Sequence, residues 1–294
     1  MDCLRAHYLY ILVMTPDTFC VCGAGTMGNG IAQVIATAGL NTILYEVNPV
    51  VLGKAKMAIE KNLDQLVKKN KITVEDKGAI IRRIVFTDQI GECVAEFIVE
   101  AIVEELKTKI QLFAELAAIN YSKTILATNT SSLRVSAIAD NIMNPERVVG
   151  MHFFNPAFAM KLVEVVRAEK TSEETVQTVV AVARALGKTP VVSKDSPGFI
   201  VNRVARPFYI ESLRLAEEGV DFKIIDELLE ASGFRLGPFR LMDLIGNDVN
   251  YSVSKTVYEQ LNQPARLKPS GIQKQKVEKG ELGRKTGKGY YLYP

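Results

Sequence analysis

Short apolar runs and longer amphipathic stretches alternate along the first two thirds of the chain. Runs rich in β-branched residues are typical of buried strands, whereas apolar residues that recur every three or four positions are typical of helices. The runs that predict strands cover residues 19–22, 41–45, 84–86, 97–101, 124–127, 148–154, 162–166 and 190–193. Helix-like stretches separate most of them, which indicates an α/β fold with a doubly wound, mostly parallel sheet.

The amphipathic stretch from Pro49 to about Asn70 is unusually long for a connection between two parallel strands. Its apolar positions are spaced by three and four residues and are Leu52, Ala55, Ile59, Leu63 and Leu66. A second helical pattern, 74–83, leads directly into the strand that begins at residue 84. We therefore expect this connection to protrude from the sheet as a helical hairpin insertion.

The pattern changes at the segment 194–198, which reads Lys-Asp-Ser-Pro-Gly. Strand signals stop there, and helical patterns cover residues 199–218, 222–231 and 241–260 and a basic segment around 269–279. We predict three parts: an N-terminal extension (1–16), an α/β domain (17–195) and an all-α domain (196–294). Because Met14 could itself start the chain, the sequence leaves open whether residues 1–13 belong to the native protein.

A Gly-x-Gly-x-x-Gly turn follows the first predicted strand. Gly23 permits the tight turn, Gly25 lets the backbone approach a pyrophosphate, and Gly28 lets the next helix pack closely on the strand. Backbone N–H groups at the start of that helix favour an anion. The turn residues expected to contact a dinucleotide are Gly23, Ala24, Gly25, Thr26, Met27 and Gly28. The α/β domain is therefore predicted to be a Rossmann-type dinucleotide-binding domain.

Glu46 closes the next predicted strand, 41–45. A carboxylate at this place accepts hydrogen bonds from the adenosine ribose and repels a 2′-phosphate. The expected cofactor is therefore NAD rather than NADP.

Composition excludes several classes of protein. The chain has 294 residues, of which 48% are hydrophobic and 23% charged, and a net charge of +3. This charge is too small to predict a nucleic-acid partner, and no apolar run is long enough for a transmembrane helix. The four cysteines are Cys3, Cys20, Cys22 and Cys93. Because Cys20 and Cys22 share one face of the first strand, we expect buried apolar side chains and no metal site. These features predict a soluble, cytoplasmic protein.

His152 is the one histidine of the chain besides His7, which lies in the predicted extension. An imidazole can exchange a proton near neutral pH, so His152 is the natural candidate for a general acid or base. Glu164 stands among apolar residues of a predicted buried strand, where a carboxylate needs a partner. Pairing of the two would fix one imidazole nitrogen as a donor and leave the other as a base. A packed histidine and an ion pair elsewhere are the alternatives that the sequence leaves open.

Further motifs extend the pattern over nearly the whole chain after Asp17. With the glycine turn and Glu46, the segments are 23–28, 100–104, 129–132, 152–156, 161–165, 195–203, 237–239 and 283–289. Together, and in this order, they resemble the short-chain L-3-hydroxyacyl-CoA dehydrogenase family, also described as 3-hydroxybutyryl-CoA dehydrogenases.

The resemblance implies that NAD oxidises the 3-hydroxyl of a short- or medium-chain acyl-CoA to a ketone, or that NADH reduces the ketone. It implies that His152 takes the hydroxyl proton, that Glu164 orients the imidazole, and that Ser131 and Asn202 hold the substrate oxygen. Further NAD contacts implied are Glu104, Lys109, Ser131, Asn155 and Lys285, and the implied CoA contacts are Asn62, Lys69 and Ser131. The helical domain is implied to close over the acyl end and to form a homodimer.

Two segments depart from the family's pattern. A serine stands in a family member where this chain has Asn62, and Arg235-Leu236 replaces a tyrosine-and-proline pattern. The second departure leaves the acyl-chain preference open.

Two other functions are compatible with a dinucleotide-binding fold. A sugar-acid dehydrogenase of the gulonate type would lack the lysine-rich helix 49–70. A non-catalytic dinucleotide sensor would have no reason to keep His152 together with Glu164, Ser131 and Asn202. Formation of NADH with 3-hydroxybutyryl-CoA, with gulonate or with neither separates these alternatives.

Overall fold

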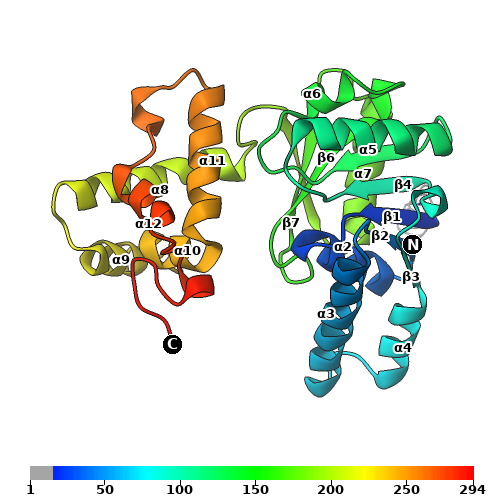
Figure 1. The fold of residues 1–294 in the computed structure, drawn as a ribbon, viewed down its shortest axis with the longest axis horizontal. Helices are drawn as coiled ribbons and strands as arrows, with labels where there is room; N and C mark the ends of the chain where they lie inside the picture. The colour runs from blue at the N-terminus through cyan, green and yellow to red at the C-terminus, as the bar shows by residue number, and fades with distance from the viewer. Residues whose placement is uncertain (1–15) are drawn as a thin grey trace, which may run out of the picture. The chain divides into compact units, whose positions relative to one another are not determined.

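The structure, a computed structural model, describes residues 16–294 and divides into two compact units (Figure 1). The first unit ends at Ser196 and the second covers Pro197–Pro294. The predicted extension, with His7 and Cys3, lies outside the described residues except for its last residue, Pro16.

One eight-stranded sheet with the order β3-β2-β1-β4-β5-β6-β7-β8 forms the centre of the first unit. The strands are β1 (Thr18–Cys22), β2 (Asn41–Tyr45), β3 (Ile84–Thr87), β4 (Phe97–Glu100), β5 (Ile125–Thr128), β6 (Val148–Phe153), β7 (Leu162–Arg167) and β8 (Thr189–Lys194). Every pair of neighbours is parallel except β6 and β7. The predicted doubly wound, mostly parallel sheet is confirmed.

The antiparallel pair β6–β7 has a simple cause. The connection between these strands covers only residues 154–161, and a parallel crossover needs a dozen or more residues. The chain therefore turns back, and each side chain of β6 faces its partner on β7 directly.

Helices cover both faces of this sheet (Figure 1). They are α2 (Thr26–Thr37), α3 (Pro49–Lys68), α4 (Val74–Arg82), α5 (Leu106–Ile119), α6 (Val135–Ala139) and α7 (Glu173–Ala185), with 3₁₀ turns η1 (Ile90–Glu92) and η2 (Pro145–Arg147). The predicted hairpin is present, and α3 and α4 extend below the sheet in Figure 1. The sequence patterns gave no sign of α6, which has only five residues and follows a polar loop.

Capping side chains set the ends of the hairpin helices. The Asn48 side chain accepts hydrogen bonds from the N–H groups of Val50 and Val51 at the start of α3. Thr73 and Asp76 form a reciprocal capping box at the start of α4. Each cap satisfies N–H groups that have no partner inside the helix.

The two faces of β1 are occupied differently. Phe19 and Val21 belong to a large buried cluster with Ile31 and Ile35 of α2. Cys20 and Cys22 point to the opposite face, because successive side chains of a strand alternate, and both are fully buried.

The second unit is helical. It contains α8 (Val201–Glu217), α9 (Phe222–Ala231), α10 (Pro238–Ile245), α11 (Asn247–Gln260) and α12 (Gly271–Glu278), with 3₁₀ turns η3 (Ala265–Leu267) and η4 (Arg284–Thr286). The prediction of one helix over 241–260 was wrong. Gly246 adopts a φ of +108°, a conformation that strongly favours glycine, and separates α10 from α11. In the described part of the chain, no helix is long and apolar enough to cross a membrane.

Candidate active site

Two of the three glycines in the turn at the end of β1 are packed closely against other atoms, and the third faces open space. A Cβ atom on Gly28 would lie 1.7 Å from the carbonyl oxygen of Gly23, and one on Gly23, whose φ is +98°, would lie 2.7 Å from the Ala101 oxygen. Both positions therefore require glycine. A Cβ on Gly25 would meet no atom within 4 Å, so the backbone is open there. The turn leads directly into the N-terminus of α2, which fits the pyrophosphate of a dinucleotide.

Glu46 follows β2 and lies against this turn. Its Oε2 accepts a hydrogen bond of 2.9 Å from the Ala24 N–H, and its Oε1 accepts one of 3.1 Å from the Asn48 N–H. A pocket of about 270 Å³ adjoins the carboxylate, and its lining includes Tyr45, Ile102 and Leu112. A carboxylate suits the ribose hydroxyls of an adenosine, and the apolar side chains of the pocket suit its base.

A buried ion pair lies between the ends of β4 and β5. The Lys109 ammonium of α5 lies 2.5 Å from Oε1 of Glu100, and both side chains are almost completely buried. Oε2 of Glu100 accepts a hydrogen bond of 2.6 Å from the Thr128 hydroxyl. The ammonium of Lys109, a predicted cofactor contact, is therefore paired with a carboxylate of the protein. Sequence reasoning missed Glu100 as the central group here, although a glutamate inside the buried run 97–101 was a visible signal.

Glu104 connects the same lysine to the loop that follows β5. Its Oε2 lies 3.2 Å from the Lys109 ammonium. Its Oε1 accepts hydrogen bonds from the Thr130 hydroxyl at 2.7 Å and from the backbone N–H groups of Ser131 at 2.9 Å and Ser132 at 3.1 Å. Burial alone would raise the pKa of Glu104, but the charge of Lys109 and these hydrogen bonds together hold it below its usual value. The Ser131 backbone is thus held in place by the charged Glu104 carboxylate.

His152 and Glu164 stand directly opposite each other on β6 and β7. Nδ1 of His152 lies 2.7 Å from Oε2 of Glu164, and both side chains are buried. The ring of Phe154 packs on the imidazole, with 4.6 Å between ring centroids. A carboxylate at Nδ1 favours the tautomer that carries its proton on Nδ1, which makes Nε2 the nitrogen that can accept a proton.

Two asparagines belong to the segments around the end of β6. Oδ1 of Asn129, in the loop after β5, accepts a hydrogen bond of 2.8 Å from the Phe153 N–H, and so ties the Ser131 loop to the end of β6. Asn155, a predicted cofactor contact, is exposed just beyond β6.

Asn202 and Lys285, the other predicted site residues, belong to the helical unit. Asn202 is in the first turn of α8, and its carbonyl oxygen accepts a hydrogen bond from Nε of Arg206. Lys285 lies in η4, where its ammonium is 2.6 Å from the Asp248 carboxylate. The Lys285 ammonium is thus neutralised by a neighbour within its own unit.

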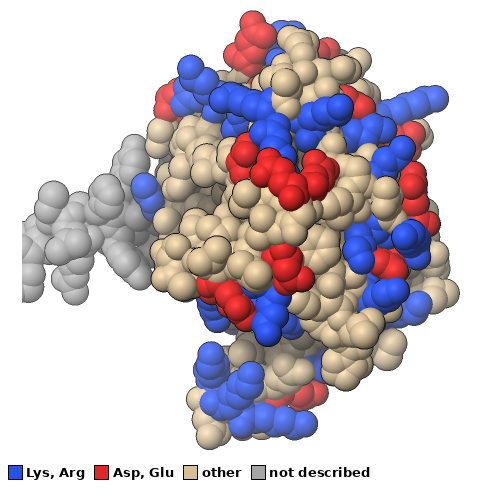
Figure 2. Space-filling view, turned by 90° about the vertical axis from the view of Figure 1, so that its left-hand side faces the viewer, with Lys and Arg blue, Asp and Glu red and all other residues tan. Residues whose placement is uncertain are grey.

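Of the three predicted CoA contacts, Asn62 lies on α3, Lys69 directly follows this helix, and Ser131 lies in the loop after β5. Lys69 follows the last turn of this helix and is exposed, and the Asn62 amide donates a hydrogen bond of 3.3 Å to Oε1 of Gln33. Other lysines of α3 and of the turn that follows it are Lys54, Lys56, Lys61, Lys68 and Lys71. Figure 2 shows basic side chains gathered around the end of the hairpin, at the bottom of the view. Such a surface suits phosphate groups.

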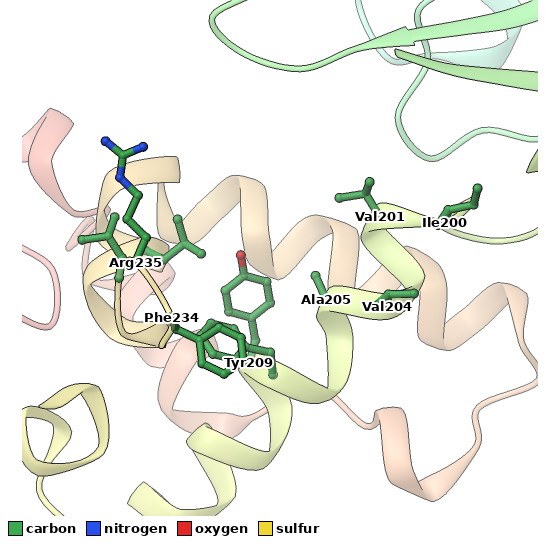
Figure 3. Close-up of a pocket in the computed structure, with 10 residues that line it drawn as sticks. Ile200, Val201, Val204, Ala205, Tyr209, Phe234 and Arg235 are labelled. Carbon is green, nitrogen blue, oxygen red and sulfur yellow. The ribbon is translucent and has the colours of Figure 1, made fainter. Parts of the chain in front are cut away.

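An apolar pocket of about 530 Å³ opens on the helical unit (Figure 3). Val204, Ala205 and Tyr209 of α8 line one part of it, and Phe234 and Arg235, which follow α9, line another. Val204 is 70% exposed and Phe234 51% exposed. Large apolar side chains are therefore accessible on this surface.

Comparison with known proteins places these features in a family. Residues 18–196 match the family described as 3-hydroxyacyl-CoA dehydrogenase, NAD binding domain, and residues 198–293 match 3-hydroxyacyl-CoA dehydrogenase, C-terminal domain. The chain belongs to the 3-hydroxyacyl-CoA dehydrogenase family. The resemblance inferred from the motifs is thereby confirmed, and the first unit is the NAD-binding domain of this family.

Individual relatives match most of this chain. The 3-hydroxyadipyl-CoA dehydrogenase of Escherichia coli K12 is 43% identical over 95% of this chain and 60% of its own length. The probable 3-hydroxybutyryl-CoA dehydrogenase of Bacillus subtilis 168 is 39% identical over 93% and 96%. The crystal structure of (S)-3-hydroxybutyryl-CoA dehydrogenase from Ralstonia eutropha matches with a TM-score of 0.91 at 35% identity and covers 95% of this chain and 100% of that one. This chain thus spans about three fifths of the E. coli relative.

Proposed function

We propose that the protein oxidises the 3-hydroxyl group of a short- or medium-chain L-3-hydroxyacyl-CoA to a ketone with NAD, or catalyses the reverse reduction. The observation that carries the proposal is the hydrogen-bonded pair of His152 and Glu164 at the end of β6, within an NAD-binding domain of this family. The names of the relatives support substrates with short acyl chains, such as 3-hydroxybutyryl-CoA and 3-hydroxyadipyl-CoA.

Proton transfer is the step that this chain's own side chains perform. Bound NAD supplies the acceptor for the hydride from C3 of the substrate. Ser131 and Asn202 hold the substrate oxygen, and Nε2 of His152 removes its proton. The imidazolium that results is stabilised by the Glu164 carboxylate at Nδ1, 2.7 Å away. In the reverse direction the same imidazolium returns the proton to the carbonyl oxygen.

The NAD site combines direct contacts with residues that act through others. The glycine turn binds the pyrophosphate, Glu46 binds the adenosine ribose, Asn155 borders the nicotinamide, and Lys285 is a further cofactor contact. Glu104 supports the cofactor site because its carboxylate holds the loop that contains Ser131. Lys109 acts indirectly, since its buried ammonium holds Glu100 and Glu104 in place. Asn62, Lys69 and Ser131 contact the CoA portion of the substrate.

The deciding experiment measures NADH formation with purified protein. The proposal is supported if 3-hydroxybutyryl-CoA is turned over. Gulonate should then not be turned over, and no NADH should form without a substrate. Turnover of gulonate alone would assign a sugar-acid dehydrogenase, and NADH binding without any turnover would assign a sensor.

Assembly and location complete the proposal. The helical unit pairs with a second copy through its exposed apolar surface, so that the enzyme is a homodimer. We place the enzyme in the cytoplasm, because NAD and CoA thioesters are metabolites of the cell interior. The domain roles follow: residues 17–195 bind NAD, and 196–294 serve substrate closure and dimerisation.

A further inference from the structure

Three cysteines meet on the face of β1 that is turned away from α2. Cys20 and Cys22 lie on β1 itself, and Cys93 follows η1 in the connection to β4. Their sulfur atoms all lie within 4.8 Å of one another, and each side chain is fully buried. Among residues 16–294, no histidine, aspartate or glutamate joins this thiol cluster. The sequence could not show it, because Cys93 is far from the other two along the chain.

The spacing of the sulfurs fits a single thiophilic ion. Thiolates bound to Zn²⁺ at about 2.3 Å in tetrahedral or trigonal geometry are separated from one another by roughly 3.8–4.0 Å. The Cys20 and Cys22 sulfurs are 3.7 Å apart. A disulfide between these two would require an approach to about 2.05 Å, although β1 is held in register by β2 on one side and β4 on the other. The cluster is therefore closer to an ion site than to a disulfide.

The chemistry of the three side chains selects the kind of ion. A metal ion binds cysteine as the thiolate, so binding releases protons. Soft thiolate ligands select ions such as Zn²⁺ and Cu⁺ over hard cations.

We propose that Cys20, Cys22 and Cys93 bind one thiophilic d¹⁰ cation of the Zn²⁺, Cd²⁺ or Cu⁺ class. Cys22 directly precedes Gly23 and pairs with Tyr45 and Glu100 on the flanking strands, so the ion lies beneath the start of the glycine turn. The site uses none of the residues assigned to proton transfer.

Cadmium is a direct probe, because its thiolate complexes absorb in the ultraviolet by charge transfer. The titration uses the full chain with Cys3→Ser, which removes the one cysteine outside the cluster and serves as the matched control. We expect one Cd²⁺ per chain, release of protons on binding, and displacement of Cd²⁺ by Zn²⁺ or Cu⁺. Cys93→Ala in this background should weaken binding more than about tenfold, because loss of an outer-shell partner alone already weakens metal sites by about 10–100-fold.

A second measurement needs no change in the cluster and so does not depend on how Cys93→Ala folds. X-ray absorption of the Zn²⁺-loaded Cys3→Ser protein should show about three sulfur neighbours near 2.3 Å. A shell of nitrogen and oxygen only, no charge-transfer band at one equivalent of Cd²⁺, or full binding by folded Cys93→Ala would each overturn the proposal.

Discussion

At the scale of single residues, the pairing of His152 with Glu164 follows from strand geometry. The two residues are opposite partners in an antiparallel ladder, so their side chains are neighbours and the carboxylate lies 2.7 Å from Nδ1. His152→Gln keeps a polar side chain of similar length but cannot exchange a proton. We expect turnover of 3-hydroxybutyryl-CoA to fall by about 10²–10⁴-fold, with NADH affinity unchanged in a fluorescence titration. Turnover within a few fold of the wild type would remove His152 from the mechanism.

Glu46 is expected to choose between the two nicotinamide cofactors. Its carboxylate already accepts the Ala24 N–H, so a cofactor phosphate at this place would meet a fixed negative charge. Glu46→Gln keeps the shape and removes the charge. The ratio of NADPH to NADH dissociation constants should shift toward NADPH by at least about fivefold, the size of about 1 kcal/mol of repulsion. An unchanged ratio would contradict this role.

Lys109 is expected to matter for stability as much as for activity. Lys109→Met leaves Glu100 buried without its cation, and breaking a buried pair in this way costs about 3–5 kcal/mol. We expect a clear fall in the midpoint of thermal or urea unfolding. Lys107→Met, on the exposed part of the same helix, is the matched control and should change the midpoint little. Equal shifts of the unfolding midpoint by the two substitutions would show that the buried ion pair does not contribute to stability.

How far the sequence could predict the site differs from residue to residue. The Gly23–Gly28 turn and Glu46 could be placed together, because their spacing along one strand-turn-helix unit determines their geometry. Lys109 could not be placed in the same way. Its position at the start of α5 is compatible with an exposed cofactor contact, and only the packing of β4 against α5 shows that its ammonium points inward to Glu100.

At the scale of elements, hydrophobic periodicity predicted most of the strands and helices and a mostly parallel sheet, but not which two strands are antiparallel. The direction of β7 depends on the length of the connection 154–161, and that direction is what places Glu164 opposite His152. The division of 241–260 into α10 and α11 depends on one backbone angle at Gly246. Periodicity carries no information about either feature, since both are set by the connections between elements.

The helix α3 is expected to bind the CoA portion of the substrate through one face. Asn62 and Lys69 are seven residues apart and therefore lie on the same side of the helix axis, whereas Lys68 points elsewhere. Lys69→Glu should raise the KM for 3-hydroxybutyryl-CoA by about 10–150-fold, the value of one charge-assisted hydrogen bond, and should leave NADH affinity unchanged. Lys68→Glu makes the same change of charge and is the control. If both raise KM equally, the general charge of the hairpin and not this face attracts the substrate.

At the scale of the whole molecule, the two compact units coincide with the two parts that the family comparison distinguishes. The first unit ends at Ser196 and the NAD-binding match also ends at residue 196. His152, Glu164 and Ser131 all belong to the first unit, whereas Asn202 and Lys285 belong to the second. The proposed reaction therefore needs residues from both units, and a protein truncated after residue 196 would retain the glycine turn but lack Asn202.

The exposed apolar surface of the helical unit is expected to pair two chains. Val204 lines the apolar pocket, and its side chain is 70% exposed in a single chain. An interface of standard size buries about 800 Å² on each partner, with an apolar centre. A charge placed in that centre cannot be paired, so Val204→Glu should convert a dimer into a monomer in sedimentation experiments at micromolar concentration. Lys255→Glu, at an exposed position of α11, is the control and should leave the dimer intact. Wild-type protein that sediments as a monomer would refute the proposed assembly, and a dimer that survives Val204→Glu would move the interface away from this pocket.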